Sequence, residues 1–534
     1  MHKDLENLWL PYTQMKGLNS ILKAQKTGSS KIFLDNGKSL IDGISSWWTA
    51  CHGYNNKHIR KNIISQLNLM PHVMFGGLVH DQAVLLSKRL SKLLNNKLEK
   101  VFFTDSGSVS VEVALKIAIQ YWINKGNDKK NKFIFFKNGY HGDTSGTMAI
   151  CDPEEGMHKL FKNYLRKNYM LNIPETDKNK NKFVNFVHKY NDKVAGVIIE
   201  PLVQGAGGMK FYSPSTLEFI YKVIKKYKLL LIYDEIATGF FRTGSMFAYQ
   251  QTNSSPDILC IGKALTGGTL SLAATISTKQ VFAAFLSNKK NRELMHGPTY
   301  MANPLACSAA NASLDLFEKV NYEKKINIIE KIFQKELQKF KKFKFVKQVR
   351  AKGAIGVIEF FNLSRHNIMW LREEFVKKNI WVRPLKNIIY FMPTFIIKKN
   401  ELKHLLEWCL KKSNNKIINI FEGAGGLLVP LEKTKTILDL MKDLNSKVVL
   451  VVGNYLGSVS HTLSAVQNLE HANLQIINII INEHINNNDI DIKDTESLLR
   501  SSINKKNIIR KVNYGDKHKS ISLKNITEDI ISSC

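Results

Sequence analysis

The chain has 534 residues, and 44% of them are apolar, which suffices for sizeable hydrophobic cores in more than one domain. Its 77 Lys and Arg against 45 Asp and Glu give a formal net charge of +32, a sign typical of proteins with nucleic-acid or anionic-membrane partners. The lysines, however, are spread along the whole chain together with Asn and Ile, as in residues 178–182 and 414–420. We therefore interpret the charge as a compositional bias, because the sequence contains no basic-aromatic module.

The cysteines and the hydropathy pattern bear on the compartment. The six cysteines have no C-x-x-C spacing, so we expect free thiols in a reducing environment. The first ten residues carry Asp4 and Glu6 and lack an apolar core, unlike a signal peptide. No run approaches the roughly 18 to 20 apolar residues that a membrane span requires. We expect a soluble, cytoplasmic protein.

The beginning of the chain carries aromatic residues on irregular segments. A short strand pair is predicted at residues 31–34 and 39–41, joined by a turn at Asp35-Asn36-Gly37. Trp47 and Trp48 follow. Two adjacent tryptophans on an irregular segment do not readily face one core, so we expect at least one to line a cavity. Ordinary core packing of both rings is the alternative.

A strand, a Gly/Ser turn and a helix come next. Residues 82–97 have the pattern of an amphipathic helix, residues 100–103 that of a strand, and residues 111–121 that of a second helix. The intervening turn contains Gly107 and Ser108. Backbone N–H groups and hydroxyls at a helix start can hold a phosphate, so these two residues are our candidate phosphate cradle. A helix cap without a ligand is the alternative.

Two further apolar strands end in polar residues. Residues 132–136 precede Tyr140, whose ring could stack on a flat ligand at the sheet edge. Residues 194–199 end at Glu200, and a Gly-rich stretch follows at 204–208. Since no Lys-Ser/Thr pair follows these glycines, we predict a tight loop there rather than a phosphate site.

The most informative stretch is residues 229–268. An apolar strand at 229–233 ends at Asp234, and a second one at 257–261 ends in a Gly-rich loop that carries Lys263. Both side chains are expected at the carboxyl edge of one sheet, where α/β proteins hold ligands. Pyridoxal 5′-phosphate requires an amine that bonds its aldehyde and an anion against its ring nitrogen, and Lys263 and Asp234 can supply them. The alternative is a helix-capping Asp and a solvated Lys.

The rest of the chain suggests further domains. Asn303-Pro304 predicts a helix start. The sequence from there to Lys412 alternates charged helices with short strands, typical of a second, smaller domain. We predict four parts. Residues 1–50 join the small domain, and residues 51–305 form a large cofactor-binding domain. Residues 306–412 form the small domain, and residues 413–534 form a carboxyl-terminal segment.

Together these motifs resemble the class III, fold-type I aminotransferases, and within them the adenosylmethionine-8-amino-7-oxononanoate aminotransferases of biotin biosynthesis. The resemblance implies an α/β fold of the type I PLP-dependent transferases, with a mostly parallel central sheet and a smaller α+β domain. It covers roughly residues 5–412 and depends on these motifs: residues 9–13, 45–48, 72–77, 105–108, 138–143, 234–239, 262–268, 296–299 and 381–384.

The resemblance assigns cofactor contacts residue by residue. Lys263 would bind pyridoxal 5′-phosphate covalently and shuttle the proton during transfer, and Asp234 would pair with the pyridinium nitrogen. Tyr140 would stack on the ring. The remaining cofactor contacts would come from Gly107, Ser108, Pro298 and Thr299, with Thr299 reaching the phosphate from the neighbouring subunit. A homodimer with shared active sites is therefore implied.

The resemblance also implies the substrates. S-adenosylmethionine would donate its amine, and 8-amino-7-oxononanoate would accept it in a second, ping-pong half-reaction that gives 7,8-diaminononanoate. Arg383 would bind the substrate carboxylate, since a guanidinium grips a carboxylate with two hydrogen bonds. An aromatic-walled cavity suits both a sulfonium cation and an aliphatic chain. The cavity would be lined by Tyr12, which would also assist catalysis, and by Trp47, Tyr140 and Gly297.

One position departs from the family pattern. Where the family has Gly-Phe-Gly-Arg-Thr-Gly, this chain has Phe241 in place of the second glycine. A positive φ at that position would strain the turn, because a side chain with a Cβ disfavours it. The departure bears on the placement of Arg242 and leaves the cofactor residues unaffected.

The carboxyl-terminal segment changes in character. Strands at 417–421, 447–452 and 474–481 and a helix at 458–469 are predicted, and the segment resembles the carboxyl-terminal half of dethiobiotin synthetase, a partial P-loop-NTPase-like α/β unit. The resemblance implies that Glu422 would be a magnesium ligand. Asn482 would lie near the nucleotide base.

The amino-terminal half of that second family is missing. No G-x-x-x-x-G-K-[ST] loop, which binds nucleotide phosphates, occurs in the 534 residues. We expect the segment alone not to make dethiobiotin. A vestigial fusion and complementation by a separate chain both remain open.

Three alternative functions also remain open at this point. The chain could be another class III transaminase that acts on an ω-amino acid such as ornithine or 4-aminobutyrate. It could be a non-catalytic basic scaffold that binds nucleic acid, which would show steep salt dependence. It could also be a bifunctional enzyme, although the missing phosphate loop argues against this.

Overall fold

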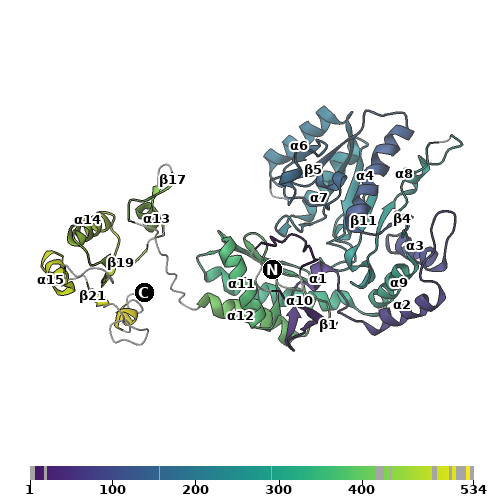
Figure 1. The fold of residues 1–534 in the computed structure, drawn as a ribbon. Coiled ribbons are helices and arrows are strands. Elements are labelled where there is room, and N and C mark those ends of the chain that lie inside the picture. The colour runs from purple at the N-terminus through teal and green to yellow at the C-terminus, as the bar shows by residue number, and fades with distance from the viewer. Residues whose placement is uncertain are drawn as a thin grey trace. The chain divides into compact units, whose positions relative to one another are not determined.

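The computed structural model describes residues 6–16, 21–154, 157–289, 291–414, 426–432, 435–444, 446–483, 490–503, 508–512 and 525–529. The chain forms two compact units, Met1–Asn414 and Asn415–Cys534, which are coloured purple to green and green to yellow in Figure 1.

The first unit is built on a seven-stranded sheet with the order β4-β12-β11-β10-β7-β5-β6. All neighbouring strands run parallel except β12, which is antiparallel to both β11 and β4. The fold-class prediction of a mostly parallel central sheet is therefore confirmed. The strands are β4 (Lys100–Thr104), β5 (Lys132–Phe136), β6 (Tyr169–Leu171), β7 (Val194–Ile199), β10 (Leu230–Asp234), β11 (Ile258–Ile261) and β12 (Ala273–Ser277).

The central strands are apolar throughout because both faces of the sheet are covered. Successive residues of β10 alternate between two hydrophobic clusters, with Leu231 and Tyr233 in one and Leu230 and Ile232 in the other. Helix α4 (Gly107–Asn124) packs on the second face, and α6 (Asp177–Tyr190) and α7 (Pro214–Lys226) contribute to the first cluster. The result is a three-layer α/β arrangement.

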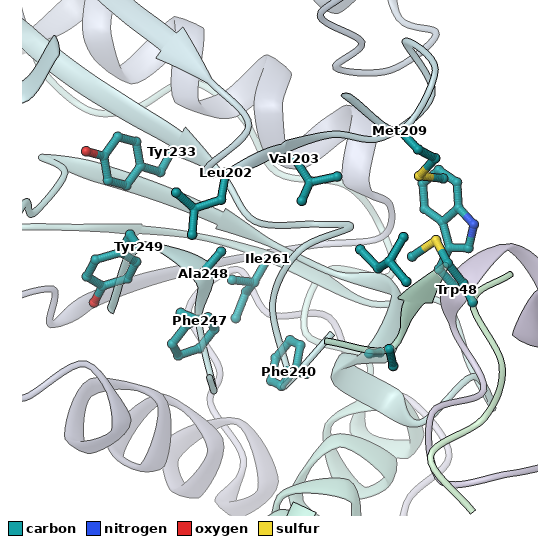
Figure 2. Packing of buried hydrophobic residues seen from close by; sticks show 14 of the residues in the cluster. Trp48, Leu202, Val203, Met209, Tyr233, Phe240, Phe247, Ala248, Tyr249 and Ile261 are labelled. Atoms are coloured by element: carbon teal, nitrogen blue, oxygen red, sulfur yellow. The ribbon is translucent and has the colours of Figure 1, made fainter. Parts of the chain in front are cut away.

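The cluster on the first face extends from the sheet to the site. Figure 2 shows Tyr233 and Tyr249 at one end of the packed side chains and Trp48 and Met209 at the other. Gly205 faces the Trp48 ring, since a Cβ on this glycine would lie 3.4 Å from it. The Gly-rich stretch connects β8 (Val203–Gln204) and β9 (Lys210–Phe211) as a tight loop, as predicted.

Two smaller sheets complete the first unit. One has the order β1-β2-β3-β15 and joins the amino-terminal strands to a strand near residue 380, because β3 pairs in parallel with β15. The other has the order β13-β14-β16 and is antiparallel. Their strands are β1 (Ala24–Gly28), β2 (Lys31–Leu34), β3 (Ser39–Asp42), β13 (Val346–Lys352), β14 (Ile355–Phe360), β15 (Ile380–Trp381) and β16 (Ile388–Phe391).

The remaining helical segments of the first unit lie around these sheets. The short ones are α1 (Ser45–Trp48), α5 (Ser145–Met148), α8 (Lys279–Ala283), η2 (Lys159–Phe161), η3 (Ala248–Gln251), η4 (Lys263–Thr266) and η5 (Lys339–Lys342). The longer ones are α2 (Lys57–Leu69), α3 (Asp81–Leu93), α9 (Pro304–Lys319), α10 (Tyr322–Gln338), α11 (Arg365–Lys377) and α12 (Lys399–Asn414). Helix α9 starts as predicted, with Asn303 as the N-cap.

The second unit contains a three-stranded parallel sheet with the order β19-β20-β21. The predicted strands at 447–452 and 474–481 and the helix at 458–469 are present with shifts of a few residues at their ends. The predicted strand at 417–421 and Glu422 lie outside the described residues. The elements are β17 (Pro430–Glu432), β18 (Lys435–Thr436), α13 (Ile437–Asp443), β19 (Val448–Gly453), α14 (Ser458–His471), β20 (Ile476–Asn482), α15 (Ile492–Ser502) and β21 (Ile509–Val512).

Within the described residues, no helix is both long and apolar enough to cross a bilayer. The five cysteines of that part of the chain are buried free thiols, as the spacing predicted. Burial raises the pKa of the thiols of Cys51, Cys151 and Cys307 to about 12, so these side chains act as small apolar residues.

Candidate active site

Three loops at the end of the central sheet meet at one side chain, that of Ile236. A Cβ on Gly107 would lie 3.0 Å from the Ile236 side chain, and a Cβ on Gly262 would lie 3.6 Å from it. Asp234 ends β10 and faces Cys260 of β11 in the strand register, so Lys263 follows just beyond the neighbouring strand. The predicted phosphate cradle, carboxylate and lysine are therefore brought together.

Lys263 is partly buried at this edge, in a left-handed backbone conformation with φ 46°. Its Nζ lies 4.1 Å from the centroid of the Trp48 ring. Burial lowers the pKa of the amine to about 8, although Asp234 and Glu200 act in the opposite direction. With this pKa about a tenth of the amine is free of its proton at pH 7, far more than for an ordinary lysine, and the neutral form is the one that acts as a nucleophile or a base. The alternative of a solvated lysine does not describe this environment.

Asp234 is buried and fixed by two hydrogen bonds. The Nδ1–H of His141 donates to Oδ2 over 2.8 Å, and the backbone N–H of Ile236 donates to Oδ1 over 3.1 Å. His141 is itself buried. Because both carboxylate oxygens have partners, the side chain cannot rotate, and its charge stays directed at one point.

Two buried glutamates flank this pair, at the ends of neighbouring strands. Glu200 accepts hydrogen bonds from the N–H groups of Tyr140, over 3.2 Å, and Gly205, over 2.8 Å. Burial raises the pKa of Glu200 to about 7, and Asp234 raises it further while His141 lowers it. Burial also raises the pKa of Glu235 to about 7. Glu235 faces away from the site, toward the N–H groups of residues 248–249.

Gly107 and Ser108 form the first turn of helix α4, which starts four residues before the predicted helix at 111–121. Ser106 is the N-cap, and its Oγ accepts from the N–H of Val109 over 3.3 Å. A helix start leaves its first N–H groups without partners inside the helix, so it can bind an anion. Ser108 Oγ accepts from the N–H of Asp143 over 3.1 Å, which leaves its own hydroxyl hydrogen available as a donor.

Tyr12 and Tyr140 converge on one carboxylate. Tyr140 donates to Asp143 Oδ1 over 2.7 Å, and Tyr12 donates to Oδ2 over 2.5 Å. A hydrogen bond from His158 holds the pKa of Asp143 down to about 2, so the acceptor stays ionised. Burial raises the pKa of Tyr12 to about 12 and that of Tyr140 well above its usual value. Both hydroxyls therefore keep their protons.

The two tryptophans point in different directions. Trp48 is 7% exposed and lies over the lysine, whereas Trp47 is 45% exposed. The Trp47 ring meets Tyr12 edge to face, with centroids 6.3 Å apart. The Arg383 guanidinium carbon lies 5.9 Å from the Trp47 centroid. We call Tyr12, Trp47 and Tyr140 the aromatic wall.

Gly297, Pro298 and Thr299 are placed elsewhere on the surface. Gly297 and Thr299 are exposed, and within the described residues no contact joins them to Lys263 or Asp234. Their loop is tied to helix α4, because Lys116 Nζ donates to the carbonyl of Met295 over 2.6 Å.

Phe241 has a positive φ of 65°, the strained conformation considered for the replaced glycine. Its ring packs on Phe317, with centroids 5.8 Å apart. The next residue, Arg242, is buried, stacks on Phe395 and donates to the carbonyl of Pro393 over 2.8 Å. Phe241 thus keeps the positive φ and packs its ring against the core, and Arg242 contacts residues beside the sheet β13-β14-β16.

His141, Asp143 and Glu200 lie around the predicted residues, although nothing in the sequence assigned roles to them. Glu200 directly follows the apolar run of β7, the same signal that identified Asp234. His141 and Asp143 lie in the quoted motif at 138–143, but nothing in the local sequence of His141 indicates that its partner, Asp234, lies 93 residues away.

The sequence model of the family described as "Aminotransferase class-III" matches residues 12–412. The chain belongs to this family. It is therefore an aminotransferase that depends on pyridoxal 5′-phosphate. A model described as "AAA domain" matches residues 393–513, which overlaps the end of the first match. The likeness of the carboxyl-terminal segment to a nucleotide-binding family is thus confirmed at the level of the family.

Named relatives cover most of the first unit. Adenosylmethionine-8-amino-7-oxononanoate aminotransferase from Buchnera aphidicola of Schizaphis graminum is 44% identical, over 77% of this chain and 96% of that protein. The protein of the same name from Corynebacterium glutamicum is 39% identical, over 74% and 93%. The crystal structure of such an aminotransferase from Methanocaldococcus jannaschii has a TM-score of 0.74 and 34% identity, over 77% and 98%.

The residues present fit the cofactor of the family. A Cβ at position 107 would crowd the Ile236 side chain. The glycine therefore keeps the start of α4 open to a ligand. A buried carboxylate, Asp234, faces the same edge as a partly buried amine with a depressed pKa, Lys263. A phosphate, a protonated ring nitrogen and an aldehyde each find a partner of suitable chemistry in this set.

Proposed function

We propose that this chain transfers the amino group of S-adenosylmethionine to the 7-keto group of 8-amino-7-oxononanoate and so makes 7,8-diaminononanoate for biotin biosynthesis. The observation that carries the proposal is the meeting of Trp47, Tyr12 and Arg383, next in the chain to Trp48, which lies over the lysine. The proteins that are 34–44% identical to the chain and bear the name of this activity support it.

The aromatic wall and Arg383 suit two dissimilar substrates that use one site in turn. A sulfonium cation is attracted to the faces of aromatic rings, and the aliphatic chain of the keto substrate gains from the same apolar surface. Both substrates carry a carboxylate that Arg383 can bind with two hydrogen bonds. A partly exposed wall leaves room for exchange between the two half-reactions.

The groups at the sheet edge divide the tasks between them. Pyridoxal 5′-phosphate, when bound, supplies the electron sink that stabilises negative charge at the substrate Cα. Lys263 would bind the cofactor, and its Nζ would move the proton at the substrate Cα. Asp234, fixed by His141, would keep the ring nitrogen protonated. Gly107 and Ser108 would hold the phosphate, and Tyr140 would cover the ring.

The direct test is to mix purified, cofactor-loaded protein with S-adenosylmethionine and 8-amino-7-oxononanoate and to detect the diamine by mass spectrometry. Formation of the diamine with multiple turnovers is the expected result. No diamine from a protein that has the absorbance of bound cofactor would refute the substrate assignment while leaving the family unaffected.

The rival within the family is an aminotransferase for an ω-amino acid. A donor screen with ornithine and 4-aminobutyrate, followed by the change in cofactor absorbance, separates the two. We expect conversion by S-adenosylmethionine only, since these rivals lack the sulfonium that the aromatic wall would bind.

The proposal includes a homodimer in which Thr299 reaches the cofactor phosphate of the neighbouring subunit. The loop with Thr299 packs against residues 71–72, with His72 and Tyr300 ring centroids 4.6 Å apart. Large apolar side chains around it are exposed, a pattern typical of subunit interfaces. They are Leu69, Met74, Leu78, Val79, Met295 and Tyr300.

Mixing inactive variants tests the shared site. Subunits with Lys263→Ala and subunits with Thr299→Glu should each be inactive, and their heterodimer should regain activity because one of its sites has both native residues. A monomer by light scattering, or no recovery after mixing, would contradict the proposal.

For the second unit we propose that it does not make dethiobiotin by itself. The loop that binds nucleotide phosphates is missing from the sequence. An ATP-dependent carboxylation assay on the full chain should give no product. The assay with an added chain that carries such a loop distinguishes a vestigial segment from one that is complemented.

A further inference from the structure

The turn that carries the two tryptophans has an unusual backbone. Ser45, Ser46, Trp47 and Trp48 all have positive φ, at 49°, 46°, 53° and 76°, and none is a glycine. Residues with a Cβ strongly disfavour this left-handed conformation, and runs of it are rare. We call Ser45–Trp48 the left-handed turn. Something outside the turn must hold it in place.

The side chain of Asp42 supplies that hold. It is fully buried at the end of β3. Its Oδ1 accepts from the N–H of Ile44 over 2.8 Å, and its Oδ2 accepts from the N–H of Ser46 over 2.8 Å. The hydroxyl of Tyr54 also donates to Oδ2 and is hydrogen-bonded to Ser46 Oγ. Both carboxylate oxygens are thus used at the entrance of the left-handed turn.

The start of the turn has two further anchors outside Asp42. Ser45 Oγ donates to the carbonyl of Met392 over 2.6 Å, and Gly43 N–H donates to the carbonyl of Trp381 over 2.9 Å. Asp42 is the register partner of Trp381, which is two residues before Arg383. The same short segment therefore fixes both tryptophans and the strand that leads to the arginine.

We propose that Asp42 is a positioning residue of the aminotransferase: its two carboxylate oxygens hold the left-handed turn, which places Trp48 over Lys263 and Trp47 between Tyr12 and Arg383. The proposal rests on the proposed function, since its kinetic readout uses those substrates. The left-handed conformation is what sends two adjacent rings to different places, one over the lysine and one into the aromatic wall.

The decisive variant is Asp42→Asn. An amide has one acceptor oxygen, so its NH₂ group would face either the N–H of Ile44 or that of Ser46, and one donor would lose its partner. We expect the turn to relax toward the ordinary right-handed region. The KM for both substrates should rise about tenfold, while the cofactor absorbance of the purified protein is retained.

A matched control separates positioning from stability. Asp257 is another buried carboxylate, which accepts from the N–H of Leu231 over 2.8 Å and pairs with Lys225 over 2.6 Å. Both Asp257→Asn and Asp42→Asn should lower the melting temperature, but Asp257→Asn should leave both KM values at the native level. A rise of KM in both variants would indicate a structural effect and overturn the proposal.

A double-mutant cycle tests whether Asp42 acts through the ring. Trp47→Ala alone should also raise KM about tenfold, and adding Asp42→Asn should change it less than threefold further, because the ring it positions is gone. A roughly hundredfold rise in the double variant would mean independent effects and would refute the proposal.

A measurement that needs no substrate tests the role of Asp42 even if the proposed substrates are wrong. Asp42→Asn should increase acrylamide quenching of tryptophan fluorescence in the holoenzyme, and this increase should vanish in a Trp48→Phe background. If Asp42→Asn does not fold, Tyr54→Phe removes one donor to the carboxylate and should give smaller changes in the same direction. Native KM and native quenching in either variant would overturn the proposal.

Discussion

The groups at the sheet edge and those of the aromatic wall are held in different ways. Asp234 and His141 are buried at strand ends, with hydrogen bonds that leave their side chains no freedom. Trp47 and Tyr12 are about half exposed, and both have positive φ. Rigid strand ends suit groups that must face one atom of a cofactor, whereas strained, exposed segments suit recognition of two substrates in turn.

The largest effect is expected for Lys263→Ala. Removing the amine takes away both the bond to the cofactor and the base, so kcat should fall by at least about 10⁴-fold. The measurement is diamine formation under saturating substrate. Added methylamine should restore part of the rate, and a kcat within tenfold of the native value would contradict the role.

Neighbouring residues at the end of β10 should respond in opposite ways. Asp234→Asn should lower kcat by about 10²- to 10³-fold with little change in melting temperature, because it removes charge aimed at the cofactor. Glu235→Ala should instead lower the free energy of unfolding by about 2–4 kcal/mol, since three donors lose their acceptor. Equal effects of both variants on kcat would contradict the distinction between Asp234, which acts on the cofactor, and Glu235, which stabilises the fold.

On the substrate side, Arg383→Lys should raise the KM for both substrates by about 10- to 100-fold and change kcat less than threefold. An ammonium cannot form the paired hydrogen bonds of a guanidinium with a carboxylate. Arg89→Lys, at a partly buried ion pair with Asp315 and Glu318, is the control and should leave KM unchanged. A large fall in kcat would instead mean that Arg383 acts in the chemical step, as the groups at the sheet edge do, and would contradict its role in substrate binding.

The pH dependence of cofactor uptake gives the smallest expected effect. Burial lowers the pKa of Lys263 to about 8, and only the neutral amine attacks an aldehyde. Below pH 8 the rate of uptake by cofactor-free protein should rise about tenfold per pH unit, and above it the rate should level off. A rate that continues to rise toward pH 10 would mean that the lysine is solvated. Stopped-flow absorbance of the cofactor measures the rate of uptake.

The carboxylate and the lysine were predictable because each follows an uninterrupted apolar run. Such runs form buried strands, and parallel strands deliver the residues after them to one edge. The glycine and serine at the start of α4 were predictable for a similar reason, since caps act within one turn of the chain. The resemblance to the family added roles to these positions.

The placement of His141 beside Asp234, and of Trp48 over Lys263, was decided by tertiary structure. These partners are far apart in sequence, and their contacts depend on which buried donors and acceptors must be satisfied. The left-handed turn is the clearest case. Serine and tryptophan disfavour that backbone locally, so no local pattern predicts it, and the buried carboxylate of Asp42 makes it favourable only after the strands around it have assembled.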